Sequence, residues 1–254
     1  MMALPENLEA VRSHFATTNP VVEDKLFPLN DSLFARYLRA RTTVKAAIDA
    51  IVKTILWRNE FKIKEMQTEW KDVLMNENST GKMYIRGFTK SGNAILYMRP
   101  KYENTKDHNG NMKHLVYHME RAIAIMNKQE KGVEKIVLLI DYDGFSIFNA
   151  PPMKTSMETL SILQNHYPER LARAYCIKPP FIFNMFWKAI YPFIDPVTKD
   201  KIVMVHDNKI LTETIDPAVL EKSLGGDDER LFESNKWLNS SFEDDYYTIL
   251  NKSI

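Results

Sequence analysis

Residues 135–144 read Lys-Ile-Val-Leu-Leu-Ile-Asp-Tyr-Asp-Gly, and this stretch decides the fold. Five apolar residues follow one another from Ile136 to Ile140, without the polar alternation of a half-exposed strand. Such a run is typical of a strand buried on both faces, as in parallel sheets that helices cover. It is far shorter than the roughly 20 apolar residues that cross a bilayer. The stretch therefore predicts a central strand of an α/β domain.

Further strands and helices alternate on either side of this strand. Short apolar runs predict strands, and apolar residues at intervals of three or four predict helices. The predicted strands cover 95–98, 174–177 and 202–205, and the predicted helices cover 115–126, 152–164 and 181–191. Strands that alternate with helices in this way indicate a mainly parallel sheet.

The first part of the chain predicts a helical subdomain over residues 1–75. Asn30-Asp31-Ser32 and Thr42-Thr43 are of the types that cap helices, and apolar residues at helical spacing follow each of them. The polar stretch 76–81 predicts a linker. The α/β domain then covers 82–228, and a polar tail with one short helix covers 229–254.

The bulk composition narrows the class of protein. The chain has 254 residues, 44% hydrophobic and 26% charged, which is typical of a globular protein. Its 34 basic and 33 acidic residues give a net charge of +1, so no basic excess indicates a nucleic-acid partner. A single cysteine, Cys176, and an N-terminus unlike a secretory signal predict a cytoplasmic protein.

The sequence contains no glycine-rich phosphate loop, nucleophile elbow or zinc-protease motif. His114 and His118 lie four residues apart and could share a metal, but no third ligand is evident, so a packed pair is favoured. Asp141 and Asp143 end the central strand and resemble the D-x-D nucleophile of haloacid-dehalogenase-type phosphatases. Because Phe145 departs from that pattern, a turn-forming role is favoured, and Cys176 is expected to be a buried, inert thiol.

Three segments together resemble the CRAL-TRIO lipid-binding family, in particular its phosphatidylinositol-transfer branch. Residues 33–41, Leu-Phe-Ala-Arg-Tyr-Leu-Arg-Ala-Arg, resemble the family's LLRFLRAR helix, and Trp57-Arg58 follows at the expected distance. Residues 140–144 resemble its strand ending in D-x-x-G. The most specific match is Asn-His-Tyr-Pro-Glu-Arg at 165–170 with Pro-Phe-Ile-Asp-Pro-Val-Thr-Lys-Asp-Lys at 192–201, which resembles YPER … PFLDPVT-x-x-K. The resemblance covers about residues 30–230.

The resemblance implies a helical N-terminal subdomain packed on a lipid-binding domain whose mainly parallel sheet floors an apolar pocket. Carried over residue by residue, the branch's headgroup positions are Arg41, Glu169, Thr198 and Lys201. Lys201 and Thr198 lie about one helical turn apart, so both can face a phosphate. Glu169 can accept hydrogen bonds from inositol hydroxyls, and Arg41 can donate or hold Glu169 in place. The alternative is a salt bridge between Arg41 and Glu169, with Lys201 solvated.

The resemblance also implies a gate and a hinge. The aromatic stretch 181–191 matches the family's gate helix, and the alternative is a simple core helix. Its candidate gate residues are Phe181, Phe183, Phe186, Trp187 and Ile190. Gly225-Gly226 matches a glycine pair of the hinge, and the alternative is an ordinary helix C-cap.

One pair of positions departs from the family. Members that also carry phosphatidylcholine have Ser and Thr on the strand before D-x-x-G, where this chain has Ile136 and Leu138. Neither side chain can donate a hydrogen bond, so phosphatidylcholine is not expected as a second ligand. We expect either no second lipid or a more apolar one, such as a sterol or a fatty acid.

The predicted function is therefore non-enzymatic: binding of phosphatidylinositol, with its transfer between membranes or its presentation to lipid-modifying enzymes. The expected partners are phosphatidylinositol and, transiently, a membrane surface. The protein is expected to act as a monomer without metal, cofactor or nucleic acid. Two alternatives stay open. One is a carrier of a purely apolar ligand (sterol, fatty acid or isoprenoid), and the other is a magnesium-dependent phosphatase at Asp141 and Asp143.

Overall fold

The computed structural model describes residues 4–18, 24 and 26–252, and within that range it leaves the side chain of Phe186 out. The chain forms two compact units. The first comprises residues 1–69 and 161–170, and the second comprises residues 70–160 and 171–254. The domain bounds expected above, 1–75, 82–228 and 229–254, stay predictions.

The first unit is helical. Its helices are α1 (Pro5–Thr18), α2 (Asp31–Ala40), α3 (Val44–Glu60) and the short η1 (Ile63–Glu65). The predicted caps are confirmed, because the Asn30 side chain accepts from the Leu33 amide and the Thr43 hydroxyl accepts from the Ala46 amide. Helix α1 was not predicted individually, although Leu8, Val11 and Phe15 carry the spacing of an apolar helix face.

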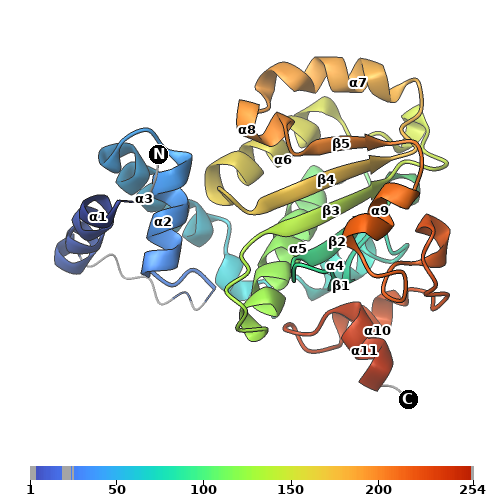
Figure 1. Cartoon of the computed structure of the whole chain (residues 1–254), viewed down its shortest axis with the longest axis horizontal. Coiled ribbons are helices and arrows are strands. Elements are labelled where there is room, and N and C mark those ends of the chain that lie inside the picture. Colours follow the sequence, from blue (N-terminus) through green and yellow to red (C-terminus); the bar gives the residue numbers. More distant parts are fainter. Residues whose placement is uncertain (1–3, 19–23, 25, 253–254) are drawn as a thin grey trace. The chain divides into compact units, whose positions relative to one another are not determined.

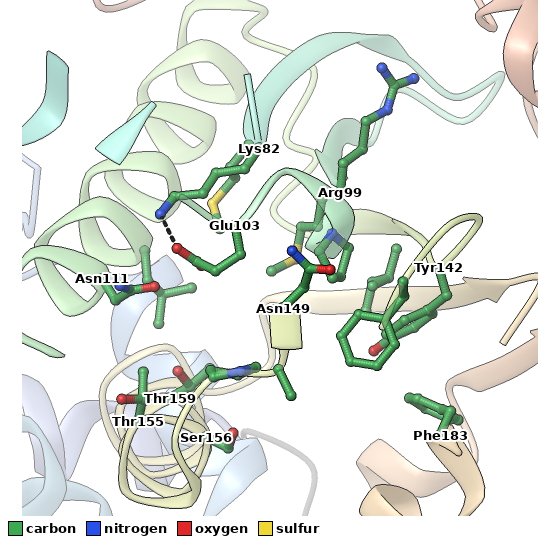
Figure 2. A pocket seen from close by; sticks show the side chains of 18 of the residues that line it. Lys82, Arg99, Glu103, Asn111, Tyr142, Asn149, Thr155, Ser156, Thr159 and Phe183 are labelled. Carbon is green, nitrogen blue, oxygen red and sulfur yellow. Dashed lines mark hydrogen bonds and ion pairs between the residues drawn. The ribbon is translucent and has the colours of Figure 1, made fainter. Parts of the chain in front are cut away.

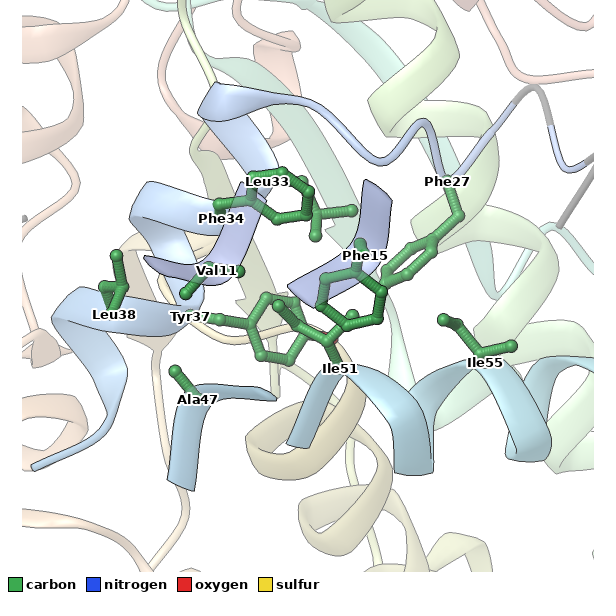
Figure 3. Close-up of a cluster of buried hydrophobic side chains, with 10 residues drawn as sticks. All are labelled: Val11, Phe15, Phe27, Leu33, Phe34, Tyr37, Leu38, Ala47, Ile51 and Ile55. Carbon is green, nitrogen blue, oxygen red and sulfur yellow. The ribbon is translucent and has the colours of Figure 1, made fainter. Parts of the chain in front are cut away.

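A cluster of apolar side chains holds the helices of this unit together (Figure 3). Phe15 of α1 stacks on Phe34 of α2 with ring centroids 5.6 Å apart. Burying a side chain of this size contributes about 1.5–3 kcal/mol, so the cluster stabilises the packing of these helices. The buried members are Val11, Phe15, Phe27, Leu33, Phe34, Tyr37, Leu38, Ala47, Ile51 and Ile55.

The second unit is built on a five-stranded sheet in the order β1-β2-β3-β4-β5 (Figure 1). The strands are β1 (Met83–Phe88), β2 (Ala94–Met98), β3 (Ile136–Asp141), β4 (Leu171–Ile177) and β5 (Ile202–Val205). Strand β1 is antiparallel to β2, and all other pairs are parallel. The predicted α/β class with a mainly parallel sheet is confirmed.

The parallel strands are joined by helices. Helix α5 (His108–Lys128) follows β2, α6 (Met153–His166) follows β3, and α7 (Phe183–Ile190) with α8 (Pro196–Lys199) follows β4. The last residues of α6 belong to the first unit. The remaining elements of the second unit are α4 (Lys71–Glu77), α9 (Lys209–Thr214), α10 (Ser234–Leu238) and α11 (Tyr246–Lys252), with the short helices η2 (Pro100–Tyr102), η3 (Ile147–Asn149), η4 (Tyr191–Phe193) and η5 (Lys222–Leu224).

Two expectations about the edges of this unit were wrong. The stretch 76–81 is not a linker between the two units, because α4 extends to Glu77 and both Glu77 and Asn78 are fully buried within the second unit. The C-terminal stretch is not a polar tail with one short helix, because it holds two helices, α10 and α11, and buries Trp237 and Tyr246 completely. A few aromatic anchors are enough to fix an otherwise polar segment.

The C-terminal segment covers one face of strands β1 and β2. Side chains alternate between the two faces of a strand, so Tyr84 and Tyr97 point away from their neighbours Met83 and Met98. The ring of Tyr84 stacks on Tyr97 at 5.2 Å and on Phe232 of the C-terminal segment at 4.1 Å. The face that carries Met83 and Met98 is thereby left for the cavity described below.

Candidate functional site

A largely apolar cavity of about 290 Å³ lies inside the second unit (Figure 2). Residues of the sheet line it, as do residues of the three connecting helices α5, α6 and α7. The volume is at the lower end of the range for pockets that take small molecules, roughly 300–1,000 Å³. The apolar lining includes Met83, Met98, Met112, Leu115, Ile140, Phe145, Ile147, Leu160, Ile182, Phe183 and Ile190.

One end of the cavity holds a buried cluster of charges. Lys82 Nζ lies 2.5 Å from Glu77 Oε2 and 2.7 Å from Glu103 Oε1. Figure 2 shows Lys82 and Glu103 on the cavity wall, with the ion pair dashed. Buried charges are retained only where they are paired in this way. Two carboxylates facing one ammonium leave the cluster with a formal charge of −1.

A second charged group on the wall is Arg99, which pairs with Glu221 and lies 3.9 Å from Asp141 Oδ2. Its charge is therefore already compensated within the unit. Nearby, Tyr142 lines the cavity, and burial raises the pKa of its hydroxyl, so it stays neutral. The Tyr142 ring lies 4.6 Å from that of Phe183 on α7. The wall thus offers neutral polar groups and charges that already have partners.

Helix α7 has an inner and an outer face. Phe183 and Ile190 are buried and line the cavity, and Trp187 between them is half-buried and stacks on Phe183 at 5.9 Å. Met185 on the outer face is 68% exposed, and Phe181 just before the helix is 86% exposed. The side chain of the fifth candidate gate residue, Phe186, lies outside the described part of the chain. The helix is thus neither a simple core helix nor wholly exposed.

The expected headgroup residues fall into two pairs. Arg41 follows α2, is half-buried, and donates from Nη1 to the Ala40 carbonyl at 3.1 Å. Glu169 follows α6 and has left-handed backbone with φ +58°. Both belong to the first unit. For a residue with a side chain, such a conformation is uncommon and is maintained only where the surroundings hold it.

The other pair, Thr198 and Lys201, belongs to the second unit. The carboxylate of Asp195 caps α8 by accepting from the Thr198 amide at 2.9 Å. The Lys201 amide donates to the Thr198 carbonyl at 3.0 Å, so the two residues lie one turn apart, as expected. The grouping of all four residues around one headgroup stays a prediction.

The histidine pair has a structural role. His118 Nδ1 lies 2.8 Å from the His114 carbonyl, and Trp237 Nε1 donates to His118 Nε2 at 3.2 Å. Both nitrogens of His118 are therefore used within the protein, and burial lowers its pKa to about 3. Within residues 4–18, 24 and 26–252, no group of three or more His, Cys, Asp or Glu side chains could hold a metal ion.

The other two reactive candidates also have structural surroundings. Asp141 is 8% exposed at its side chain, and its Oδ1 accepts from the Asp143 amide, whereas Asp143 is 59% exposed and pairs with Lys178. These two carboxylates do not share one environment. Cys176 is buried, and burial raises the pKa of its thiol to about 12. A protonated thiol in apolar surroundings is inert.

The expected hinge glycines form a tight turn. Gly225 caps η5 with φ +94°, a conformation that glycine adopts without strain. A Cβ on Gly226 would lie 2.0 Å from the Leu220 carbonyl oxygen, so only glycine fits there. This turn explains both glycines, and a hinge motion stays a prediction.

Sequence reasoning missed the polar part of the cavity. Lys82 directly precedes β1 and Glu103 follows η2, whereas His114 in the middle of α5 was considered only as one of a possible metal-binding pair. Nothing in their local sequence links them. The signal that could have found Lys82 is a charged residue directly before the apolar stretch Met83-Tyr84-Ile85.

The combination defines a class: an α/β unit whose sheet and crossover helices enclose an apolar cavity. The model of the CRAL/TRIO domain family matches residues 78–226, and the chain belongs to this family. The chain is 33% identical over 236 residues to the phosphatidylinositol transfer protein PDR17 of Saccharomyces cerevisiae, covering 89% of this chain and 66% of that protein. It is 36% identical over 217 residues to a CRAL-TRIO domain-containing protein of Schizosaccharomyces pombe, covering 85% of this chain and 21% of that protein.

These alignments span only part of the relatives, about two thirds of the first protein and about a fifth of the second. Among solved structures, that of Sfh5 superimposes with a TM-score of 0.71, covering 99% of this chain and 98% of Sfh5. At 14% sequence identity this similarity shows the fold alone. Among the described residues, every helix is too short or too polar to cross a bilayer.

Proposed function

We propose that the chain binds phosphatidylinositol in this cavity and exchanges it at membrane surfaces. The observation that carries the proposal is an apolar cavity in the second unit, one wall of which is a helix with exposed apolar residues on its other face. Two acyl chains hold roughly 30 methylenes, each stabilised by about 0.8 kcal/mol when shielded from water. A carrier must replace about 20 kcal/mol of that shielding, and an apolar cavity does so.

Three further findings support phosphatidylinositol as the ligand. Relatives from two species carry the name phosphatidylinositol transfer protein. All four headgroup positions hold the residue types of that branch, namely Arg41, Glu169, Thr198 and Lys201. Glu169 also holds left-handed backbone, which is more frequent at binding sites than elsewhere. We propose that Lys201 and Thr198 bind the phosphate, while Glu169 and Arg41 bind the inositol ring.

The cavity is a third of the size that two acyl chains would need at roughly 30 Å³ per methylene, which is about the volume of a water molecule. We therefore propose that α7 moves outward as the lipid enters. The apolar residues around this helix favour a membrane as the place where that happens. Phe148 and Phe181 are each 86% exposed, and each is next in sequence to a residue that lines the cavity, Ile147 and Ile182.

The test is transfer of labelled phosphatidylinositol between vesicles. Lys201→Ala and Glu169→Ala are each expected to slow transfer roughly 10- to 100-fold, because each removes a hydrogen bond to or from a charged group. Lys199→Ala, which removes the same charge from the same turn, is the matched control and should transfer normally. Unchanged transfer by both site variants would refute the headgroup assignment.

The membrane contact has its own test. Phe181→Asp and Met185→Asp place charges on the exposed face and should weaken binding to vesicles. They should leave the free energy of unfolding within about 0.5 kcal/mol of the wild type, because both side chains are exposed. Normal vesicle binding by the double variant would exclude α7 as the membrane contact.

A carrier of a purely apolar ligand is the second candidate. The side chains of Ile136 and Leu138 supply no hydrogen bond where the resemblance places a choline phosphate, and the lining of the cavity is largely apolar. A carrier of a purely apolar ligand would transfer neither labelled phosphatidylinositol nor labelled phosphatidylcholine. If the chain carries phosphatidylinositol, its transfer of phosphatidylcholine should stay far lower, and equal transfer of both phospholipids would contradict the expected lack of a choline-phosphate site.

A further inference from the structure

A histidine on the cavity wall has a ring nitrogen without a hydrogen-bond partner among the described residues. His114 lies in the middle of α5, lines the cavity, and is only 1% exposed. Its Nε2 atom is buried and makes no hydrogen bond to any described residue. A buried nitrogen left unpaired costs about 1–3 kcal/mol, so such atoms are rare and call for a specific reason. Neighbouring His118, by contrast, has both ring nitrogens paired.

The ring of His114 is electrically neutral. Burial lowers its pKa well below the usual value, and the nearby positive charge of Lys82 adds to this effect. A neutral imidazole nitrogen either accepts or donates a single hydrogen bond. A hydroxyl group can do both, so it matches His114 Nε2 in either tautomer.

The charged cluster at this end of the cavity disfavours a negatively charged head group. Lys82 forms ion pairs with Glu77 and Glu103, so the three side chains have a formal charge of −1. A carboxylate or phosphate placed beside them would be repelled, and the only ammonium group of the cluster is already paired. A fatty acid or an anionic headgroup is therefore disfavoured at this end of the cavity, whereas an uncharged alcohol is not.

We propose that His114 Nε2 binds the hydroxyl group of a neutral, otherwise apolar lipid that occupies this cavity. The inference deepens the proposed function, because it rests on the same cavity acting as a lipid site and names the class of a second ligand. The shared chemistry is one uncharged hydroxyl on an apolar body. Two sources supply it: a fused-ring alcohol of the sterol kind, or a straight-chain alcohol.

The test compares ligands that differ only in the hydroxyl group. Fluorescent dehydroergosterol is bound to the lipid-free protein and displaced by cholestanol or by cholestane, and in a second arm by hexadecanol or by hexadecane. We expect each alcohol that fits the cavity to compete about tenfold better than its hydrocarbon, the size of one buried neutral hydrogen bond. The arm that shows the difference identifies the source.

The variant His114→Leu should remove this difference, because it should weaken binding of the alcohol about tenfold and leave binding of the hydrocarbon unchanged. His114→Gln, whose amide can donate and accept, should restore part of it. Thr159→Val, which removes another hydroxyl from the cavity wall, is the matched control and should keep the preference. If His114 had only a structural role, His114→Leu would change the affinities for the alcohol and for the hydrocarbon by the same factor.

Three results would overturn the inference: no binding of either alcohol to the wild-type protein, equal competition by alcohol and hydrocarbon, or an unchanged preference in His114→Leu. If His114→Leu does not fold, the alcohol preference of the wild-type protein and that of His114→Gln still show whether His114 binds the hydroxyl group. Loss of phosphatidylinositol binding by the wild type, with the alcohol preference intact, would instead refute the proposed function alone.

Discussion

Filling the cavity is expected to stabilise the lipid-free protein and to abolish its lipid binding. Thr159 of α6 lies on the cavity wall, as Figure 2 shows, and is half-buried. In Thr159→Phe, the ring enters a space of about 290 Å³ that the protein's own side chains leave open. Replacing a small side chain inside a folded unit by an aromatic one usually destabilises the protein. Thr159→Phe is expected to stabilise it instead, because the cavity has room for the ring.

The direction in which Thr159→Phe changes the free energy of unfolding shows whether the interior is hollow or filled. Burying a phenylalanine side chain contributes about 1.5–3 kcal/mol, and part of this is offset by the threonine contacts and side-chain entropy that are lost. We therefore expect Thr159→Phe to raise the free energy of unfolding by about 1 kcal/mol. In a filled interior the same ring would overpack, which typically costs about 1–3 kcal/mol.

The assay is urea denaturation of delipidated protein, followed by uptake of labelled phosphatidylinositol. Ser161→Trp is the matched control, because it adds an aromatic side chain at an exposed position of the same helix. It should change neither stability nor uptake. A Thr159→Phe protein that is destabilised by 1 kcal/mol or more, or that takes up lipid normally, would refute the reasoning.

Two further predictions concern the framework of the second unit. Arg86 is fully buried and pairs with Glu221 at 3.0 Å and Asp228 at 2.5 Å. Because Arg86→Ala leaves these carboxylates without their partner, it should lower the free energy of unfolding by about 3–5 kcal/mol in urea denaturation. A loss below 1 kcal/mol would contradict the structural role of Arg86. His118 has a folded pKa of about 3, below its unfolded value of about 6.5, so the unfolded chain binds more protons between these values. Stability should therefore fall as the pH drops below 6.5, by about 1.4 kcal/mol per pH unit from His118 alone. His118→Gln should flatten the profile between pH 6.5 and 5, and an unchanged slope would show that His118 is protonated in the folded protein.

The sequence predicted the parallel part of the fold because that part is carried by local patterns. The uninterrupted apolar run of β3 and the capped helices α2 and α3 lie where their residues predict. Strand β1 was not predicted, because it contains Arg86 and Gly87, which are atypical of a buried strand. Arg86 is tolerated only through carboxylates that lie more than 130 positions further along the chain, a pairing that no local pattern reveals.

The candidate site shows the same limit. The aromatic character of α7 was visible in the sequence, but the division into an inner face with Phe183 and an outer face with Met185 depends on what the helix packs against. The charged end of the cavity joins Glu77, Lys82 and Glu103 through tertiary contacts. Whether the Nε2 atom of a buried histidine has a hydrogen-bond partner among the described residues, as that of His118 has and that of His114 has not, follows from the packed structure alone.

The most direct test of the account is mass spectrometry of the lipid that co-purifies with the native protein. A protein with this cavity should carry one lipid per chain, either phosphatidylinositol or a neutral lipid with a single hydroxyl group. Phosphatidylcholine as the main bound lipid, or a freshly isolated protein that carries none and takes none from vesicles, would contradict it.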